Sequence, residues 1–574
     1  ALKRCALEAK KGCGMSRAAN QSAPFEDVNL FVCDPALRRA VVREGAAHAL
    51  GALEAYGADA GSAEMQAHAR SANANRPVLR THDPRGERID HITYDPGYHA
   101  LMQLGVGAGL HAASWSYMDA TPDAAGAATG AGQGDLAIGS NVARAAGLVM
   151  ASQLEPGHVC PLTMTNAAVA TLMGDEGMAL TMVPRILARR YDPELRHMSE
   201  KSSLTVGMAM TERQGGSDVR ANLTTATPLG GPDASGDDGY LVNGEKWFMS
   251  APMSDAFLIL AQAPGGLSCF MMPRVLPDGE MNGIHLRRLK SKLGNHANAS
   301  AEVVFDEAQA WRIGEEGRGI PVIMEMVTHT RLDCALGSLG LMRRGLVEAI
   351  HHVRQRATFG RRLIEQPLMQ QVLADMALHV EACTALTMRL ARAFDQPEDE
   401  QERAWARLLT PIVKYWVCKS APAFLAEAME CLGGNGYVED FPLALLYREA
   451  PVNAIWEGAG NMMALDVLRV LQRDADVLDL VFLELGELSG GHRLIDQHLA
   501  DTRALLFNPR EIDANLRALT DRLASVAAAA LMHVHAERDT GAAYVESRLE
   551  PGRLTTFGAR QIEGAAAIVE AALP

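Results

Sequence analysis

Three long helix-forming runs constrain the fold of this chain most strongly. They cover Ile320–Arg356, Pro367–Phe394 and Gln401–Leu432, and each exceeds about 25 residues, beyond the usual length of a helix in a globular protein. Consecutive helices of this length bury their apolar faces most simply as an antiparallel bundle. A shorter helix is expected to run from Asn461, whose side chain suits a helix cap, to Arg473.

A series of short strands is predicted before this bundle. Tyr240–Phe248 carries Asn243-Gly244 between apolar residues, which is the strongest short-range signal for a β-hairpin. Further strands are expected at Phe257–Ala261, Ser268–Met272, Ile284–Leu289 and Ala301–Phe305. About a hundred residues of short strands fit a small barrel or sandwich.

The residues before the strands have a helical pattern, with runs such as Asp34–Tyr56 and Asn141–Leu154. Asp34 can cap the first run, with Pro35 at the first helical position. Asp123–Ala137 is rich in Gly and Ala without periodicity, which predicts a flexible surface insertion.

The expected fold class is therefore mixed and mainly α-helical, with several domains. We expect a flexible N-terminal segment (1–28), an N-terminal helical domain (29–206), a β-barrel domain (207–316), a helical bundle (317–473) and a further C-terminal helical domain (474–574).

Composition and spacing narrow the functional class. The net charge is −15 and the pI about 5.7, so any DNA binding needs a local basic patch. Nine cysteines are scattered without a Cys-x-x-Cys pair, and no His-Glu-x-x-His spacing occurs, so neither a disulfide framework nor a metal site is expected. We find neither a signal peptide nor an apolar run of about 18 residues, which predicts a cytoplasmic protein without a membrane span.

Two segments carry the strongest chemical signal. Met208–Asp218 places the hydroxyls of Thr211 and Ser217 around a Gly-Gly turn at the end of a strand-like run, where they can meet a flat ligand rich in hydrogen-bond acceptors. An ordinary strand ending in a turn is the alternative interpretation. Far downstream, Ile455–Gly460 sets the single carboxylate of Glu457 between bulky apolar groups and a glycine-rich bend. Desolvation there makes a carboxylate a stronger base; a solvated carboxylate before a helix is the alternative.

Together with Lys246–Ser250, these segments resemble the flavin and catalytic-base motifs of the acyl-CoA dehydrogenases. The amino-acid sequences of Met208–Asp218 and Pro451–Gly458 most resemble those of the AidB branch, the alkylation-response flavoproteins. The resemblance implies an acyl-CoA dehydrogenase-like fold, FAD as cofactor and Glu457 as the base that removes the α-proton of a thioester. It places the FAD contacts at Met208, Met210, Thr211, Gly216, Ser217, Phe248, Met249, Ser250, Arg356, Phe359, Gly433, Gly434, Ile455, Gly458 and Asn461.

The same resemblance bears on substrate and assembly. Arg331 aligns with a family arginine near the acyl thioester, whereas Thr328 stands where many relatives carry a carboxylate that helps bind CoA, so weak acyl-CoA turnover is expected. The segment Arg356–Gly360 and the glycines Gly433 and Gly434 reach the FAD of a neighbouring subunit in relatives. A homo-oligomer is therefore implied, with a tetramer built from dimers as the expected state. A plain helix end is the alternative interpretation of the two glycines.

The AidB resemblance further implies that double-stranded DNA is a partner and that the chain limits alkylation damage, through its C-terminal domain. Residues 471–574 hold ten arginines, no lysine and sixteen acidic residues, so that domain is not uniformly basic. Arginines at regular intervals could still gather on one helix face and contact phosphates; the candidates are Arg469, Arg473, Arg503, Arg510 and Arg517. A solvated face of mixed charge is the alternative.

Three functions therefore stay open. The first is an FAD protein of the AidB type that binds DNA, with weak dehydrogenase activity. The second is a conventional dehydrogenase for a branched or unusual acyl-CoA that never meets DNA. The third is a flavin-bound scaffold without turnover.

Overall fold

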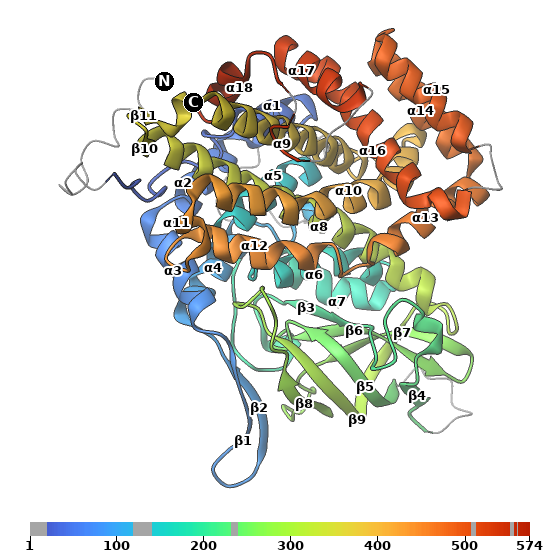
Figure 1. The fold of residues 1–574 in the computed structure, drawn as a ribbon. Coiled ribbons are helices and arrows are strands. Elements are labelled where there is room, and N and C mark those ends of the chain that lie inside the picture. Colours follow the sequence, from blue (N-terminus) through green and yellow to red (C-terminus); the bar gives the residue numbers. More distant parts are fainter. Residues whose placement is uncertain (1–19, 119–139, 231–238, 507–511, 551–555, 560) are drawn as a thin grey trace.

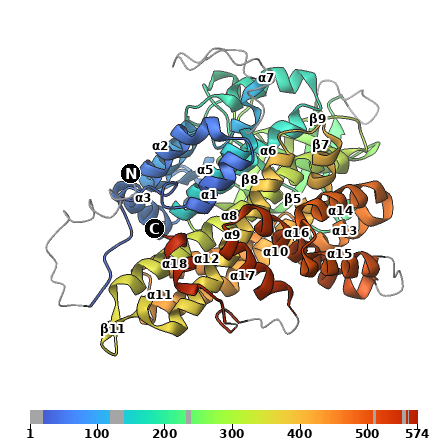
Figure 2. The same cartoon turned by 90° about the horizontal axis from the view of Figure 1, so that it is seen from above.

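The computed structural model describes residues 20–118, 140–230, 239–506, 512–550, 556–559 and 561–574. Helices fill the upper part of Figure 1, and a β-sheet domain lies below them. Figure 2 shows α2 (Leu50–Ala60) and α3 (Ala63–Ala74) on one side of the long central helices, and α14 (Ala475–Ser489) and α15 (Arg493–Leu506) on the other. The predicted class, mixed and mainly helical, is confirmed.

The three long helices begin and end within one residue of their predicted bounds. They are α8 (Gly319–Gln355), α9 (Pro367–Ala393) and α10 (Glu400–Leu432). Three shorter helices follow, namely α11 (Gly434–Tyr437), α12 (Pro442–Asn453) and α13 (Gly460–Arg473). The predicted cap at Asn461 is wrong, because α13 starts one residue earlier and Ala459 takes the cap position without a side-chain hydrogen bond.

A seven-stranded sheet forms the β domain. Its strands are β3 (Val206–Ala209), β4 (Thr225–Pro228), β5 (Tyr240–Ser250), β6 (Ala256–Ala263), β7 (Gly266–Pro273), β8 (Ile284–Leu289) and β9 (Ser300–Ile313). The order is β3-β5-β4-β6-β7-β9-β8, and additional pairings of β3 with β6 and of β5 with β9 fold the sheet back on itself. The expected small barrel is confirmed as a barrel-like sheet.

The hairpin predicted at Asn243-Gly244 is wrong, since β5 runs straight through both residues. The register against β9 shifts between Val242 and Gly244, which marks a β-bulge. Gly244 has a φ of 151°, and a Cβ there would lie 2.6 Å from the Thr224 hydroxyl. Close approach of a neighbouring strand therefore requires the glycine, and no turn does.

The N-terminal part is helical but also contains a hairpin that the sequence did not reveal. Asp34 caps α1 (Pro35–Arg43) through a hydrogen bond from Leu37 N of 3.1 Å, as predicted. The other helices here are α4 (Pro96–Gly107), α5 (Ser140–Leu154), α6 (Val159–Leu172) and α7 (Glu176–Leu187). The hairpin of β1 (Val78–His82) and β2 (Arg88–Thr93) extends from these helices beside the β domain (Figure 1). The insertion predicted at Asp123–Ala137 lies outside the described residues.

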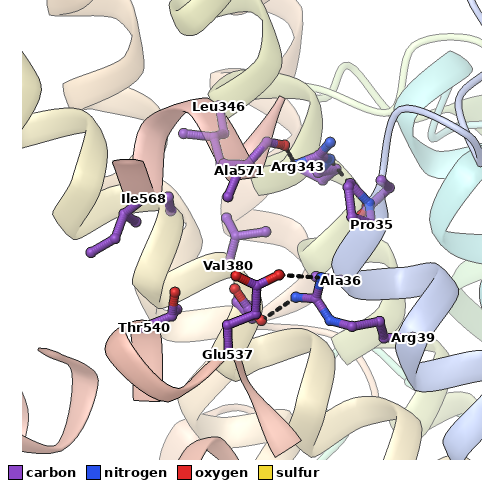
Figure 3. Close-up of a pocket in the computed structure, with 14 residues that line it drawn as sticks. Pro35, Ala36, Arg39, Arg343, Leu346, Val380, Glu537, Thr540, Ile568 and Ala571 are labelled. Carbon is purple, nitrogen blue, oxygen red and sulfur yellow. Dashed lines mark hydrogen bonds and ion pairs between the residues drawn. The ribbon is translucent and has the colours of Figure 1, made fainter. Parts of the chain in front are cut away.

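The last helices are α16 (Ile512–His535), α17 (Arg538–Leu549) and α18 (Ala565–Ala572). Figure 3 shows a small cavity where α17 and α18 meet α1, α8 and α9. Arg39 bonds Glu381 there at 2.7 Å, and Arg343 donates to the carbonyl of Ala572 at 2.8 Å. The cavity contains none of the predicted site residues.

Candidate active site

The two segments predicted to hold the flavin lie on neighbouring strands. Met208 of β3 pairs with Ser250 of β5, and Trp247 N donates to the carbonyl of Thr211 at 2.8 Å. In the part of the chain that the structure describes, no protein group hydrogen-bonds the hydroxyls of Thr211, Ser217 or Ser250. These hydroxyls are therefore free to bind a polar ligand, and the residues present fit the ring of FAD.

A buried ion pair that the sequence did not point to holds these strands together. Lys246 Nζ lies 2.8 Å from Glu212 Oε1 and also donates to the carbonyl of Leu260. Burial lowers the pKa of Lys246, while Glu212 raises it. Burial acts to raise the pKa of Glu212, but hydrogen bonds from its neighbours, with that of Gln214 the largest, lower it to about 2. The contact between Lys246 and Glu212 fixes the segment after Thr211 against β5.

The predicted flavin contacts on these strands differ in exposure. Gly216 and Ser217 are exposed, and the Phe248 ring is 47% exposed. Met208 is buried and Met210 partly buried. Met249 is fully buried in the hydrophobic core.

Glu457 lies in the tight loop between α12 and α13. Its backbone has a φ of 57°, in the left-handed region, and Gly458 follows with a φ of 110°. Neither conformation is common for a residue with a side chain. The loop therefore holds Glu457 in a strained conformation, which surrounding contacts must stabilise.

Two buried cations and one hydroxyl of the bundle supply those contacts. Thr330 of α8 donates its hydroxyl to Glu457 Oε2 at 2.8 Å. Arg331 Nε donates to the carbonyl of Glu457 at 3.1 Å, and Lys414 Nζ of α10 donates to the carbonyl of Gly458 at 2.5 Å. Arg331 is itself fixed by Asp466 of α13 at 2.7 Å. Sequence reasoning found Arg331 but missed Thr330, Lys414 and Asp466.

The surroundings of Glu457 suit a base. The residue is partly buried, and burial raises the pKa of its carboxyl, while the Thr330 hydrogen bond and the charges of Arg331 and Lys414 lower it in part. The neighbouring Trp456 packs against the hydrophobic cluster that contains Met208 of β3. The base loop and β3 thus share one apolar cluster. The predicted contact Ile455, which is 64% exposed, lies on the same loop, and Asn461 lies in the first turn of α13.

The other predicted FAD residues lie at the opposite ends of the long helices. Arg356 follows α8, 25 residues after Arg331, or about 37 Å along a helix axis. Phe359 is completely exposed at the tip of the hairpin of β10 (Ala357–Thr358) and β11 (Arg361–Arg362). Gly433 ends α10 with a φ of 60°, as the plain helix-end interpretation expects, and open space surrounds it and Gly434. Within one chain, these residues are far from Glu457.

The arginines proposed for DNA are partly engaged within the chain. Arg469 lies 3.9 Å from Asp466, and Arg503 bonds Asp479 at 2.6 Å. Arg517 donates to the hydroxyl of Tyr415 at 3.2 Å. Arg473 is exposed, and Arg510 lies outside the described residues.

No group of three or more His, Cys, Asp or Glu side chains in the described residues is placed to hold a metal ion. None of the helices described is long and apolar enough to cross a membrane.

Three family models match successive parts of the chain. The adaptive response protein AidB N-terminal domain matches residues 20–193, the acyl-CoA dehydrogenase middle domain 207–308, and the acyl-CoA dehydrogenase C-terminal domain 317–472. Fold and site together therefore define an oxidoreductase of the acyl-CoA dehydrogenase type.

Similar proteins agree with this class. The putative acyl-CoA dehydrogenase AidB of Escherichia coli (strain K12) is 45% identical over 500 residues, which cover 86% of this chain and 87% of that protein. Acyl-CoA dehydrogenase family member 11 of Caenorhabditis elegans is 31% identical, over 84% of this chain and 76% of that protein. The crystal structure of Caenorhabditis elegans ACDH-11 in complex with C11-CoA has a TM-score of 0.82 at 28% identity, and the match covers 95% of this chain and 94% of that one.

The chain belongs to the acyl-CoA dehydrogenase family, in its AidB-like branch. Membership confirms the resemblance, the FAD-dependent oxidoreductase class and FAD as the expected cofactor.

Proposed function

We propose that this protein dehydrogenates an acyl-CoA thioester, with Glu457 as the base that removes the α-proton. The observation that carries the proposal is the Glu457 loop, whose strained backbone is held by Arg331 and Lys414 while Thr330 orients the carboxylate. A base in a water-poor site with a raised pKa suits removal of a weakly acidic C–H proton. Bound FAD would supply the acceptor for the β-hydrogen of the substrate, which leaves as hydride.

The chain's own residues supply binding and orientation. We assign the ring of FAD to residues of β3, of the segment after it and of β5, and to residues of the base loop and the start of α13. They are Met208, Met210, Thr211, Gly216, Ser217, Phe248, Met249, Ser250, Ile455, Gly458 and Asn461. Thr211, Ser217 and Ser250 offer free hydroxyls, which stabilise negative charge on the ring. Arg331 acts through the loop, and a contact from it to the thioester remains a prediction.

The remaining FAD contacts require a second copy of the chain. Arg356, Phe359, Gly433 and Gly434 lie about 30 Å or more along the helices from the base loop. Phe359 and Tyr437 are large rings exposed by 100% and 80%, which suits an interface rather than bulk water. We therefore propose a homo-oligomer, with a homotetramer as the expected state. We also propose a cytoplasmic location.

Anaerobic titration of the FAD-loaded protein tests this function. A series of acyl-CoA thioesters that includes an eleven-carbon chain, the ligand in the ACDH-11 complex, should bleach the flavin absorbance. Glu457→Gln should retain FAD but lower the rate of bleaching by about 10²–10⁴-fold, as loss of a general base does. Bleaching at the wild-type rate in this variant would refute the base assignment, and no bleaching of the wild type by any thioester would favour the scaffold.

Double-stranded DNA is the second candidate partner, with protection against alkylation damage as the role. Its support is the AidB resemblance together with the exposed Arg473 and the half-exposed Arg469 and Arg503. Because Arg469 and Arg503 already face carboxylates, contact with phosphate has to displace those partners. Binding to a DNA duplex at several salt concentrations tests it: a steep loss of affinity with salt, reduced in Arg473→Ala, supports the role, and no binding at low salt refutes it.

A further inference from the structure

A buried polar junction joins three parts of the molecule behind the Glu457 loop. The Glu449 carboxylate of α12 accepts two hydrogen bonds from one residue of the β8–β9 loop, Asn295. Asn295 Nδ2 donates to Oε1 at 2.7 Å, and its backbone N–H donates to Oε2. Glu449 is 3% exposed and Asn295 4%. A carboxylate buried this deeply is expected to have specific partners.

The β8–β9 loop is tightly fitted between its neighbours. A Cβ at Gly294 would lie 2.5 Å from the carbonyl of Arg448 on α12, and one at Gly157 would lie 3.2 Å from Asn298 N. Gly157 belongs to the turn between α5 and α6. Lys292 Nζ closes the loop on itself through the carbonyl of Asn298 at 2.7 Å and Asn295 Oδ1 at 3.2 Å. The loop therefore has little room to shift on either side.

The junction connects the flavin strand to the base through a short series of contacts. At the β end, Ala251 N donates to the carbonyl of Ala299 at 3.1 Å, directly after Ser250. At the helix end, Asn453 lies four residues after Glu449, on the same face of α12. Asn453 Oδ1 accepts from the Trp456 indole at 3.0 Å, and Glu457 is the next residue. Ser250 and Glu457 are thus joined through the Asn295–Glu449 contact.

We propose that Glu449 is a positioning residue, which sets the distance between the catalytic base and the flavin-binding strand through its paired bonds to Asn295. This inference rests on the proposed function, because it assigns a catalytic consequence to that distance. Proton and hydride leave adjacent carbons, so base and flavin must be held in fixed register. Displacements of about 1 Å in such sites can cost about 100-fold in rate.

The protonation state of Glu449 matters for these bonds. Burial raises the pKa of Glu449 to about 7; the Asn295 hydrogen bonds and the Lys292 charge lower it, and the Glu155 charge raises it. Other titratable groups nearby include His158, which bonds Glu155, and Cys160, on which Lys292 and Glu449 act. His296, next to Asn295, bonds the carbonyl of Lys292, and the charges of Arg76 and Arg448 act on it. Only the ionised carboxylate can accept both donors of Asn295, because a proton on one oxygen would face a donor.

The experiment exchanges the two polar groups across the contact. Glu449→Gln places an amide N–H opposite an Asn295 donor, so one bond is lost, and flavin reduction by saturating acyl-CoA should slow by about 10-fold or more. In the double variant Glu449→Gln with Asn295→Asp, the glutamine accepts from the backbone N–H and donates to the new carboxylate. Both bonds return, and the rate should recover to within about 3-fold of wild type. Asn295→Asp alone should be slow, since two carboxylates then face each other.

A second readout does not depend on turnover. Amide hydrogen exchange of residues 454–460 should speed up in Glu449→Gln and return to the wild-type rate in the double variant. If Glu449→Gln does not fold, Asn295→Gly is the alternative. It removes the side-chain bond to Glu449, together with those from Lys292 and Asn298, and keeps the left-handed backbone (φ 56°), with a smaller change of the same sign. If no thioester reduces the flavin, the proposed function is refuted. Hydrogen exchange still decides whether Glu449 positions the loop.

A buried carboxylate elsewhere is the matched control. Glu402 is 3% exposed and bonds Arg389 and Arg392. Glu402→Gln should lower the melting temperature without changing flavin reduction or loop exchange. The positioning role is overturned if Glu449→Gln also lowers only the melting temperature, or if the double variant recovers stability but not rate.

Discussion

The two ends of the long helices α8 and α10 differ in how their functional residues are held. Beside the Glu457 loop, Thr330, Arg331 and Lys414 are at most 8% exposed, and each bonds the loop. At the other end, Phe359 and Gly433 project from the chain with nothing packed around them. The difference teaches that the Glu457 loop is fixed within one chain, whereas the far end is not, which is why we propose that a second copy of the chain covers it.

Replacing Lys414, the buried cation beneath the Glu457 loop, should have the largest effect on the rate of flavin reduction. Lys414→Met keeps the length of the side chain but loses the bond to the Gly458 carbonyl and the positive charge near Glu457. The rate of flavin reduction should fall by about 100-fold, measured by stopped-flow absorbance. Lys419→Met, an exposed lysine on the same helix, is the control and should react normally. Equal rates in both variants would show that Lys414 does not hold the Glu457 loop in its active conformation.

Straining the loop backbone should have a smaller effect. Gly458→Ala forces a side chain into a φ of 110° and places its Cβ 2.6 Å from Met463 Cε. We expect a cost of about 1–3 kcal/mol in the free energy of unfolding, read from urea denaturation, and a flavin reduction rate about 10-fold lower. Gly486→Ala, in open space within α14, should be neutral or stabilising. Unchanged kinetics in Gly458→Ala would mean that the loop conformation is unimportant.

Replacing Phe359, at the end of the long helices that lies away from Glu457, should affect assembly more than stability. Phe359→Ser removes a ring that is completely exposed in one chain, so unfolding of the isolated chain should change by no more than about 0.5 kcal/mol. Light scattering should show a smaller oligomer, and the purified protein should retain less FAD. Leu180→Ser, which removes a side chain 72% exposed on α7, should leave both unchanged. An unaltered oligomer in Phe359→Ser would contradict an interface at this end.

The smallest effect concerns how the melting temperature depends on pH through the carboxyl of Glu457. Burial raises the pKa of Glu457 in the folded protein above its value in the unfolded chain. Such a group contributes stability at pH values below its unfolded pKa, and this contribution is lost as the pH rises through the folded pKa. The melting temperature of Glu457→Gln, relative to wild type, should therefore increase as the pH rises above 4.5, the ordinary pKa of a glutamate carboxyl. A difference that is constant with pH would show that Glu457 keeps an ordinary pKa.

The sequence predicts those parts of the fold that local pattern dictates. Helices α8 to α10 lie within one residue of their expected bounds, and β8 matches fully. The turn signal at Asn243-Gly244 failed because the close approach of Thr224, directly before β4, requires that glycine. The β1–β2 hairpin was missed because its anchor is distant: Asp90 accepts from Leu286 N at 3.1 Å, 196 residues away.

The sequence likewise predicts only some residues of the candidate site. Glu457 and Arg331 stand in short motifs that a single sequence can reveal. The groups that hold them do not, because Thr330 meets Glu457 across 127 residues, Lys246 meets Glu212 across 34, and Asn295 meets Glu449 across 154. No spacing rule links such positions, and only the folded chain brings them into contact.

Deuterium incorporation at the substrate's α-carbon tests the central claim most directly. The FAD-loaded wild type, incubated anaerobically with an acyl-CoA in deuterated water, should place deuterium at that carbon, as read by mass spectrometry of the recovered thioester. Glu457→Gln, with its FAD still bound, should incorporate it at least about 100-fold more slowly. Equal incorporation in the two proteins would show that another group takes the proton and would contradict the account.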